Sequence, residues 1–275
     1  MVKIFTMVKG EVDIVREWII YHGELFGYNN LFVIDNFSLD GTWEILQEYK
    51  NQIHLFRLPD YKLKGIYMTK LIKRYCENEF AFPIDIDEFI VLYDKKSNTI
   101  NCETNMIHSY LRKLPLKPIY KMNYISSKLH SDLGYINAVN ESLWGNYDNY
   151  GSAAKSFIQS SIFTGTIDHG NHMNTNNYVA TDLCLVHYHS RNLTQMHKKI
   201  YNNVKGFNYP VFNLNALKQL LVKNPQCPGN HHVRNQISVL EKTYKLPVSC
   251  VNAIDISLTP ILEKMNEFKK NLNNK

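Results

Sequence analysis

The chain has 275 residues, is 44% hydrophobic and 20% charged, and contains 9 prolines and 12 glycines. This composition excludes a disordered or low-complexity chain, and we expect one globular domain over residues 1–275. The formal charge of +6 is spread along the chain without a dense Lys/Arg block, so we expect no nucleic-acid partner.

The first 92 residues alternate between strand-like and helix-like segments, as in βαβ units with a parallel sheet. Strands are expected at residues 3–8, 31–34, 53–58 and 80–86. Helices are expected at residues 11–26, around Trp43 to Leu46, and at residues 68–77. The sequence therefore predicts a Rossmann-like α/β fold with a mostly parallel central sheet flanked by helices.

Beyond residue 92 the pattern weakens and predicts a C-terminal helical and loop portion. A helix is expected at residues 106–114, a strand at 119–126 and loops over 131–150. Short strands at 157–163 and 183–187 precede helices at 193–204, 214–221 and 233–244. After Pro260 we expect a surface helix that frays.

The sequence gives no sign of a membrane or secretory segment. Its apolar runs are strand-sized, whereas a membrane-spanning helix needs about 20 apolar residues. The strand-like run at residues 3–8 leaves no room for a signal peptide before it. The five cysteines lie far apart without a Cys-x-x-Cys pair, which favours a reducing compartment. We therefore expect a cytoplasmic protein.

Asp85-Ile86-Asp87 is the strongest motif in the sequence. Side chains two apart on an extended chain share a face, so both carboxylates are expected at the carboxyl end of the fourth strand. Such a pair suits Mg²⁺ or Mn²⁺ bridging to the diphosphate of a nucleotide donor, and Asp85 and Ile86 are expected to contact that donor. The alternative is a solvated loop or a helix cap. Glu88 points the other way and is expected to support the pair.

The ends of the first two strands are expected to form a crevice for a nucleoside, because neighbouring parallel strands end side by side. Thr6, Val8 and Lys9 end the first strand, and Asp35 ends the second. Asp35 would accept a hydrogen bond from the base, and the main chain at Val8 would contact the base edge. The alternative for Asp35 is an Asx-type turn.

A second polar strand end is His187-Tyr188-His189-Ser190-Arg191. His187 and His189 share a face, and a neutral imidazole is a suitable further ligand for Mn²⁺. We prefer His187 as that ligand, although the histidines could equally form a structural cluster. Arg191 would contact phosphate.

Lysines and further carboxylates complete the candidate set. Phosphate contacts are expected from Lys64, Lys70 or Lys155. A base is needed to deprotonate an acceptor hydroxyl, and the candidates are Asp168, Glu141 and Asp132. Residue type alone does not choose among these three carboxylates, because the assignment of a base requires geometry.

Several of these motifs occur together in one known family. They are Met7-Val8-Lys9-Gly10-Glu11 followed by Glu17-Trp18-Ile19-Ile20-Tyr21-His22, then Asp35-Asn36-Phe37-Ser38-Leu39-Asp40-Gly41-Thr42, Asp85-Ile86-Asp87-Glu88-Phe89, Lys155-Ser156-Phe157-Ile158 and Val186-His187-Tyr188-His189-Ser190. In these blocks the chain resembles glycosyltransferase family 92 and related family-2-like GT-A enzymes. It departs from the family at Gly10, where Asn is usual, and at Gln159-Ser160, where Arg-Pro is common. Trp18 and His22 match the family motif, but their helical spacing indicates packing residues.

The resemblance implies a GT-A fold, a UDP-sugar donor, Mn²⁺ (or Mg²⁺), and inverting transfer by single displacement to a glycan or glycoprotein acceptor. Residues 1–92 would form the nucleotide-sugar-binding half, 93–255 the acceptor-side half, and 256–275 a C-terminal helix or tail. Two alternatives stay open. A sugar-phosphate nucleotidyltransferase would usually show a Gly-rich loop that residues 7–11 lack. A catalytically inactive carbohydrate-binding or scaffold protein is suggested by the 18 tyrosines.

Overall fold

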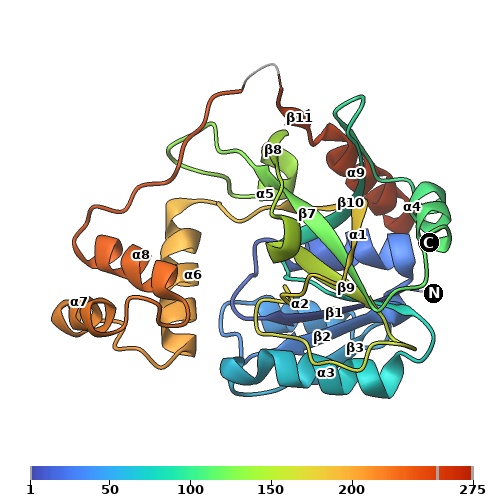
Figure 1. The fold of residues 1–275 in the computed structure, drawn as a ribbon. Helices are drawn as coiled ribbons and strands as arrows, with labels where there is room; N and C mark the ends of the chain where they lie inside the picture. Colours follow the sequence, from blue (N-terminus) through green and yellow to red (C-terminus); the bar gives the residue numbers. More distant parts are fainter. Residues whose placement is uncertain (1, 252–253, 274–275) are drawn as a thin grey trace.

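A mixed β-sheet crosses the molecule in the computed structural model, which describes residues 2–251 and 254–273 (Figure 1). Its strands are β1 (Val2–Val8), β2 (Leu31–Asp35), β3 (His54–Arg57), β4 (Phe80–Pro83), β5 (Glu88–Asp94), β6 (Thr99–Asn101), β7 (Ile119–Ser127), β8 (Trp144–Asp148), β9 (Lys155–Gln159), β10 (Val179–His187) and β11 (Ile256–Ser257). The main path of the sheet runs β3-β2-β1-β4-β9-β7-β10-β5-β6, with β8 on β7 and β11 on β8.

The helices are α1 (Val15–Phe26), α2 (Thr42–Glu48), α3 (Lys64–Tyr75), α4 (Thr104–Arg112), α5 (Ala138–Glu141), α6 (Leu193–Gly206), α7 (Leu214–Lys223), α8 (Asn230–Leu240) and α9 (Thr259–Asn273). Alternate residues of β1 face opposite sides of the sheet. Ile4 and Val8 join a core that includes residues of α1 and α9, whereas Phe5 and Met7 join a core that includes residues of α3. The predicted α/β class, with helices on both faces of the sheet, is confirmed.

The first half of the sheet is parallel, as the sequence predicts. β1 pairs with β2 so that Val8 lies opposite Asp35, and on its other side β1 pairs with β4 so that Phe5 lies opposite Pro83. β3 extends the parallel set beyond β2. The carboxyl ends of β1, β2 and β4 therefore meet at one edge, where open α/β sheets bind ligands. The second half is mixed: β9, β5 and β6 run antiparallel to their neighbours, and β10 is parallel to β7.

Several predicted elements differ from the structure at their ends. The first helix begins at Val15 rather than residue 11. A turn comes first, in which the backbone carbonyl of Glu11 accepts from the N–H groups of Ile14 and Val15. The third helix begins earlier, at Lys64, and the fourth strand ends at Pro83 rather than residue 86.

The prediction of loops over residues 131–150 is wrong in part, because this segment contains α5 and the strand β8. The sequence of β8 is Trp-Gly-Asn-Tyr-Asp, which lacks a clear apolar alternation and is held by its pairing with β7. The tail helix is α9, and it is more than a surface element, since Ile261, Met265 and Phe268 are buried in the main core. The predicted tail also includes residues 274–275, which lie outside the described residues.

Helices α6, α7 and α8 form a unit beside the sheet, at the left of Figure 1. This unit has a small core of its own, built from Val204, Leu217, Cys227 and Val233. Met196, near the start of α6, packs instead into the main core. None of the helices in the described part of the chain is both long and apolar enough to cross a membrane.

Trp18 and His22 of α1 are fully buried packing residues, as their spacing predicts. The Nδ1 of His22 lies 3.0 Å from the carbonyl of Trp18, and Nε2 accepts from the N–H of Ile90 at 3.4 Å. This arrangement requires a neutral ring with its proton on Nδ1. Burial lowers the pKa of His22 from 6.5 to about 3.

We expect the buried, neutral His22 to lower the free energy of unfolding in mild acid. At pH values between about 3, the pKa of His22 in the folded chain, and its ordinary value of 6.5, the imidazole is protonated in the unfolded chain but not in the folded one. The free energy of unfolding therefore rises with pH across this window. His22→Phe should remove up to about 1.4 kcal/mol per pH unit from that slope, measured by urea unfolding between pH 5 and pH 7. Trp18→Phe, a packing control, should lower stability without changing the slope. Parallel pH profiles for wild type and His22→Phe would contradict the assignment.

Candidate functional site

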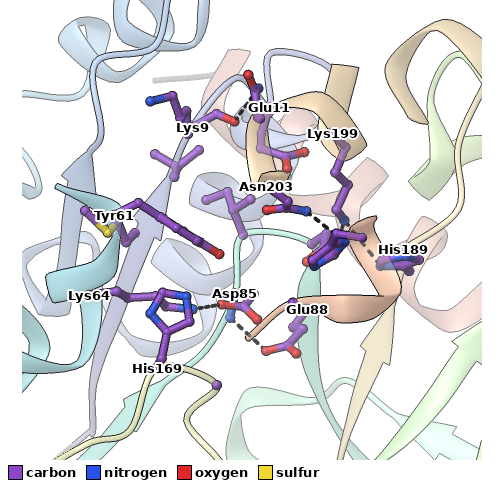
Figure 2. Close-up of a pocket in the computed structure, with 18 of the residues that line it drawn as sticks. Lys9, Glu11, Tyr61, Lys64, Asp85, Glu88, His169, His189, Lys199 and Asn203 are labelled. Carbon is purple, nitrogen blue, oxygen red and sulfur yellow. Dashed lines mark hydrogen bonds and ion pairs between the residues drawn. The ribbon is translucent and has the colours of Figure 1, made fainter. Parts of the chain in front are cut away.

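A cavity of about 380 Å³ opens at the carboxyl ends of β1 and β4. It is lined by the end of β1, by the β4–β5 turn and by the end of β10. Its remaining walls come from Lys64 at the start of α3, the loop around His169, and the unit α6–α8 (Figure 2). Both motifs that the sequence singles out, Asp85-Ile86-Asp87 and the His187/His189 pair, line this one cavity.

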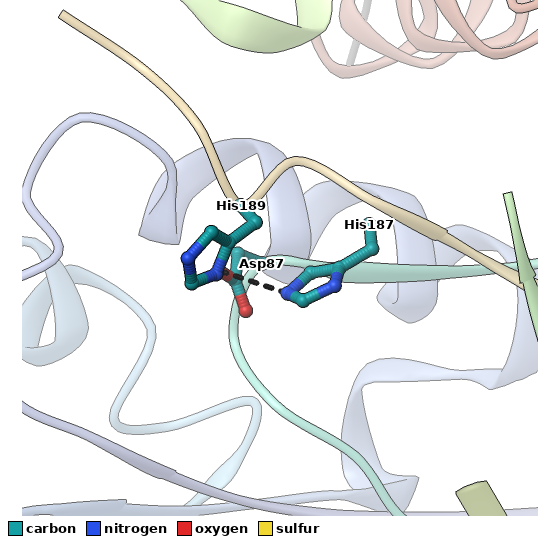
Figure 3. Close-up of side chains that lie close together, drawn as sticks. All are labelled: Asp87, His187 and His189. Carbon is teal, nitrogen blue, oxygen red and sulfur yellow. Dashed lines mark ion pairs between the residues drawn. The ribbon is translucent and has the colours of Figure 1, made fainter. Parts of the chain in front are cut away.

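Asp87, His187 and His189 form a triangle of side chains in this cavity (Figure 3). Each offers one ligand atom, and these atoms lie within 4.8 Å of one another. The triangle follows from strand pairing: β10 runs antiparallel to β5 with His187 opposite Glu88, and the N–H of Tyr188 donates to the carbonyl of Asp87 at 2.9 Å. The Nε2 of His187 lies 3.4 Å from Oδ2 of Asp87.

Lys199 of α6 provides the positive charge beside this triangle. Its ammonium pairs with Oδ2 of Asp87 and lies 3.4 Å from Nδ1 of His189. Burial opposes ionisation of Asp87, but Lys199 and then His187 outweigh it and hold the pKa of Asp87 well below its usual value. Lys199, with burial, lowers the pKa of His189 well below its usual range. The site therefore offers a carboxylate beside a neutral imidazole.

Asp85 faces different partners from Asp87. Its Oδ1 lies 2.5 Å from the ammonium of Lys64, and its Oδ2 lies 2.8 Å from that of Lys155. Burial opposes ionisation, but Lys155 and Lys64 outweigh it and hold the pKa of Asp85 well below its usual value. The two carboxylates separate because the chain turns after β4 instead of continuing as a strand. Asp85 is accordingly not one of the three residues in the metal-ligand triangle.

Glu88 supports this arrangement, as its position in the motif suggests. Its Oε2 accepts from the N–H of Asp85 at 2.7 Å, and its Oε1 lies 3.0 Å from Lys155. Burial raises the pKa of Glu88. Lys155 is itself buried, yet Asp85 and Glu88 outweigh the desolvation and raise its pKa well above the ordinary value. Lys155 is therefore a permanent cation that ties β9 to the motif.

The expected nucleoside crevice is formed only in part. Val8 and Lys9 line the cavity, but Asp35 is fully buried and Thr6 is buried with it. The carboxylate of Asp35 lies 3.1 Å from Nε of Arg57 and accepts from the N–H of Ser38 at 3.2 Å. Asp35 therefore closes a local turn, as in the alternative for this residue, although its acceptor bonds the N–H three residues on rather than the two of an Asx-turn.

Arg191 does not lie at the cavity with the histidines. Its guanidinium is buried and pairs with Glu11 at 2.5 Å and with Asp13 at 2.8 Å, which joins the end of β10 to the β1–α1 loop. Burial opposes the charge, but Glu11 and Asp13 outweigh it and raise the pKa of Arg191. Lys70 is exposed on α3, away from the cavity lining.

The three candidate bases are exposed and lie outside the cavity lining. Asp168 accepts from the backbone N–H groups of His172 and Met173 in a turn. Glu141 accepts from the N–H of Asn137 at the start of α5. The carboxylates that do line the cavity are Glu11, Asp85, Asp87 and Glu88.

Sequence reasoning missed much of the cavity wall. The missed residues are Glu11, Tyr61, Tyr124, His169, His172, Lys199, Asn202, Asn203, Phe207, His231 and His232. Most come from the α6–α8 unit or from loops, and no local motif marks them. Glu11 follows Lys9-Gly10 in a block noted in the sequence, and His169 and His172 stand in the same short segment as Asp168.

No protein-family model matches the chain, and no curated protein matches it. Among solved structures, residues 1–349 of TarS from S. aureus are similar with a TM-score of 0.40 and 11% identity, over 88% of this chain and 71% of that one. Glucosyl-3-phosphoglycerate synthase from Mycobacterium tuberculosis, in complex with Mg²⁺ and uridine diphosphate, is similar with a TM-score of 0.40 and 11% identity, over 76% of this chain and 80% of that one. HddC from Yersinia pseudotuberculosis gives 0.38 and 10%, over 72% and 97%. Similarity at these identities and TM-scores carries no conclusion about the function of this chain.

We expect Arg191→Met to be strongly destabilising, by about 3–5 kcal/mol, because it leaves two carboxylates without their buried partner. The control is Arg16→Met, which breaks a solvent-exposed pair with Glu48 and should change stability little. Urea unfolding of the two variants measures the difference. Equal small losses would show that Arg191 is not the structural tie between β10 and the β1–α1 loop.

Proposed function

We propose that the protein is a metal-dependent glycosyltransferase of the GT-A type, which transfers a sugar from a nucleotide diphosphate donor to a hydroxyl acceptor. The observation that carries this proposal is the convergence of two sets of groups in one cavity. The triangle Asp87, His187 and His189 would hold a divalent ion. The ammonium groups of Lys64 and Lys155, both paired with Asp85, supply positive charge beside this ion site. A diphosphate needs both kinds of group.

The donor atoms of the triangle fit a divalent transition ion. One carboxylate oxygen and two imidazole nitrogens suit Mn²⁺ better than Mg²⁺, which prefers oxygen ligands throughout. Such an ion supplies charge stabilisation on the departing nucleotide diphosphate. Asp87, His187 and His189 are the residues that would hold it, and Asp85 is the carboxylate that orients the neighbouring lysines.

Lys64 and Lys155 are placed to bind the diphosphate itself. Both ammonium groups are desolvated and already held in position by Asp85, so little side-chain freedom is lost when an anion binds. Val8 and Lys9 at the end of β1 line the part of the cavity where the nucleoside would lie. A UDP-sugar is the donor that the sequence resemblance favours.

Inverting transfer by single displacement also requires a base near the acceptor hydroxyl. Burial raises the pKa of Glu11, which lines the cavity and pairs with Arg191 rather than with Lys64 or Lys155. A carboxylate with a raised pKa is a better proton acceptor. Glu11 therefore joins Asp168, Glu141 and Asp132 as a candidate base. The acceptor, a glycan or glycoprotein in this proposal, would enter beside α6–α8.

The decisive experiment is a screen of nucleotide sugars for Mn²⁺-dependent release of free nucleotide diphosphate. Asp87→Asn should reduce that release by about 100-fold or more, because the ion loses its carboxylate ligand. Asp94→Asn, at the exposed end of β5 and outside the cavity lining, serves as the matched control and should keep wild-type activity. Unchanged release from Asp87→Asn, with the fold intact by circular dichroism, would remove the metal role.

The same screen separates the alternatives. A nucleotidyltransferase would release pyrophosphate from a nucleoside triphosphate and a sugar phosphate, and an inactive scaffold would release nothing. Calorimetry with UDP and Mn²⁺ adds a second distinction, since a carbohydrate-binding scaffold should give no metal-dependent heat.

The phosphate role of Lys64 predicts a specific loss of affinity. Lys64→Met should weaken UDP binding about tenfold by calorimetry, while uridine binding changes little, because only the diphosphate meets the ammonium. Lys70→Met removes a lysine of the same helix that is exposed and away from the cavity, and should leave both affinities unchanged. A loss confined to Lys70→Met would reverse the assignment.

A further inference from the structure

The ammonium of Lys199 lies at Asp87, in the position where the proposed metal ion would bind. Its ammonium and the Nε2 of His187 contact the same carboxylate oxygen, Oδ2 of Asp87. The same ammonium also approaches Nδ1 of His189 at 3.4 Å. A protein cation therefore contacts two of the three groups that would ligate a metal ion. Figure 3 shows these three groups, and Figure 2 labels Lys199 and His189.

The position of Lys199 is set by contacts that do not involve Asp87. The helix α6 begins with a capping box between Asn192 and Gln195, and Met196 packs into the main core. The neighbouring Lys198 pairs with Asp40 at 2.6 Å. The helix would therefore stay in place if the ammonium of Lys199 left the carboxylate.

A divalent ion and this ammonium cannot share Oδ2 of Asp87 at low cost, because two like charges a few ångströms apart repel strongly in a poorly solvated site. The side chains of Lys199 and Asp87 are 14% and 5% exposed, so solvent screens them little. The four-carbon stem of lysine is flexible and lets the ammonium move. Glu11, another carboxylate of the cavity lining, is close enough to Lys199 for their charges to interact, and gives the displaced ammonium a partner.

We propose that Lys199 is a built-in competitor of the divalent ion: it neutralises Asp87 when the metal is absent, and the ion binds only by displacing it. Lys199 thereby sets the affinity of the site for metal and keeps the cavity folded without one. This inference rests on the proposed function, since it requires the Asp87–His187–His189 triangle to be a metal site.

Direct measurement of Mn²⁺ binding to the full chain, without nucleotide, tests the competition. Lys199→Met and Lys199→Gln should bind Mn²⁺ at least about tenfold more tightly than wild type, because the ion no longer displaces an ammonium. Lys198→Met, one residue away on the same helix, should bind like wild type. Equal or weaker binding by both Lys199 variants would overturn the inference.

Thermal unfolding without metal gives a second readout that does not depend on Mn²⁺. Lys199→Met should lower the melting temperature, because Asp87 is left buried without its partner. Adding Asp87→Asn to that variant should restore most of the loss. A double variant that is no more stable than Lys199→Met would show that the pair is not coupled, and would also overturn the inference.

Asp87→Asn distinguishes failure of this inference from failure of the metal site. If Asp87→Asn abolishes Mn²⁺ binding while the Lys199 variants bind like wild type, the site stands and the competition is wrong. The metal site itself is wrong if wild type and the Lys199 variants do not bind Mn²⁺, or if they bind it equally well after Asp87→Asn is added. The inference then fails with the site.

Discussion

The structure depends on balancing the negative charge concentrated in the turn between β4 and β5. Asp85, Asp87 and Glu88 lie within four consecutive positions at the edge of the cavity. Carboxylates removed from water are tolerated only when cations or hydrogen-bond donors compensate them. The compensating groups are Lys64, Lys155, His187 and Lys199, which come from α3, β9, β10 and α6. The turn between β4 and β5 thus contacts elements from both halves of the chain, and these elements meet at the cavity.

The sequence predicts the features that depend on local pattern. Short, nearly continuous apolar runs place the parallel strands β1, β2 and β4, and hence the edge of the sheet at which Asp85 and Asp87 lie. The pair His187 and His189 is likewise found at the end of a strand, in the same cavity as the aspartates. The mixed pairing in the second half of the sheet is harder to predict from the sequence. Its register depends on contacts between β7, β9 and β10, which are distant from one another in the chain.

Several predictions that differ from the structure involve partners that are far away in the chain. Asp35 pairs with Arg57, Arg191 with Glu11 and Asp13, and Asp87 with Lys199, which is 112 positions away. A strand-end aspartate that binds a base and one that closes a turn have the same sequence pattern. The expectation that Asp85 and Asp87 share a face assumes an extended chain, but the strand has already ended at Pro83. Only the tertiary fold distinguishes these cases.

The two aspartates also differ in how a ligand reaches them. The side chain of Asp85 is 34% exposed although two lysines bind it, whereas that of Asp87 is 5% exposed beneath Lys199. The side chains of Lys64 and Lys155 are only 5% and 2% exposed, so Asp85 is the member of this cluster that faces the open part of the cavity. A cation reaching Asp87 must first move a side chain of α6. The unit α6–α8, which also presents Asn202, Phe207 and His232 to the cavity, therefore supplies both the ammonium at Asp87 and part of the cavity wall. Within the proposed function, the group that balances the charge of Asp87 would belong to the same helical unit as the acceptor side of the cavity.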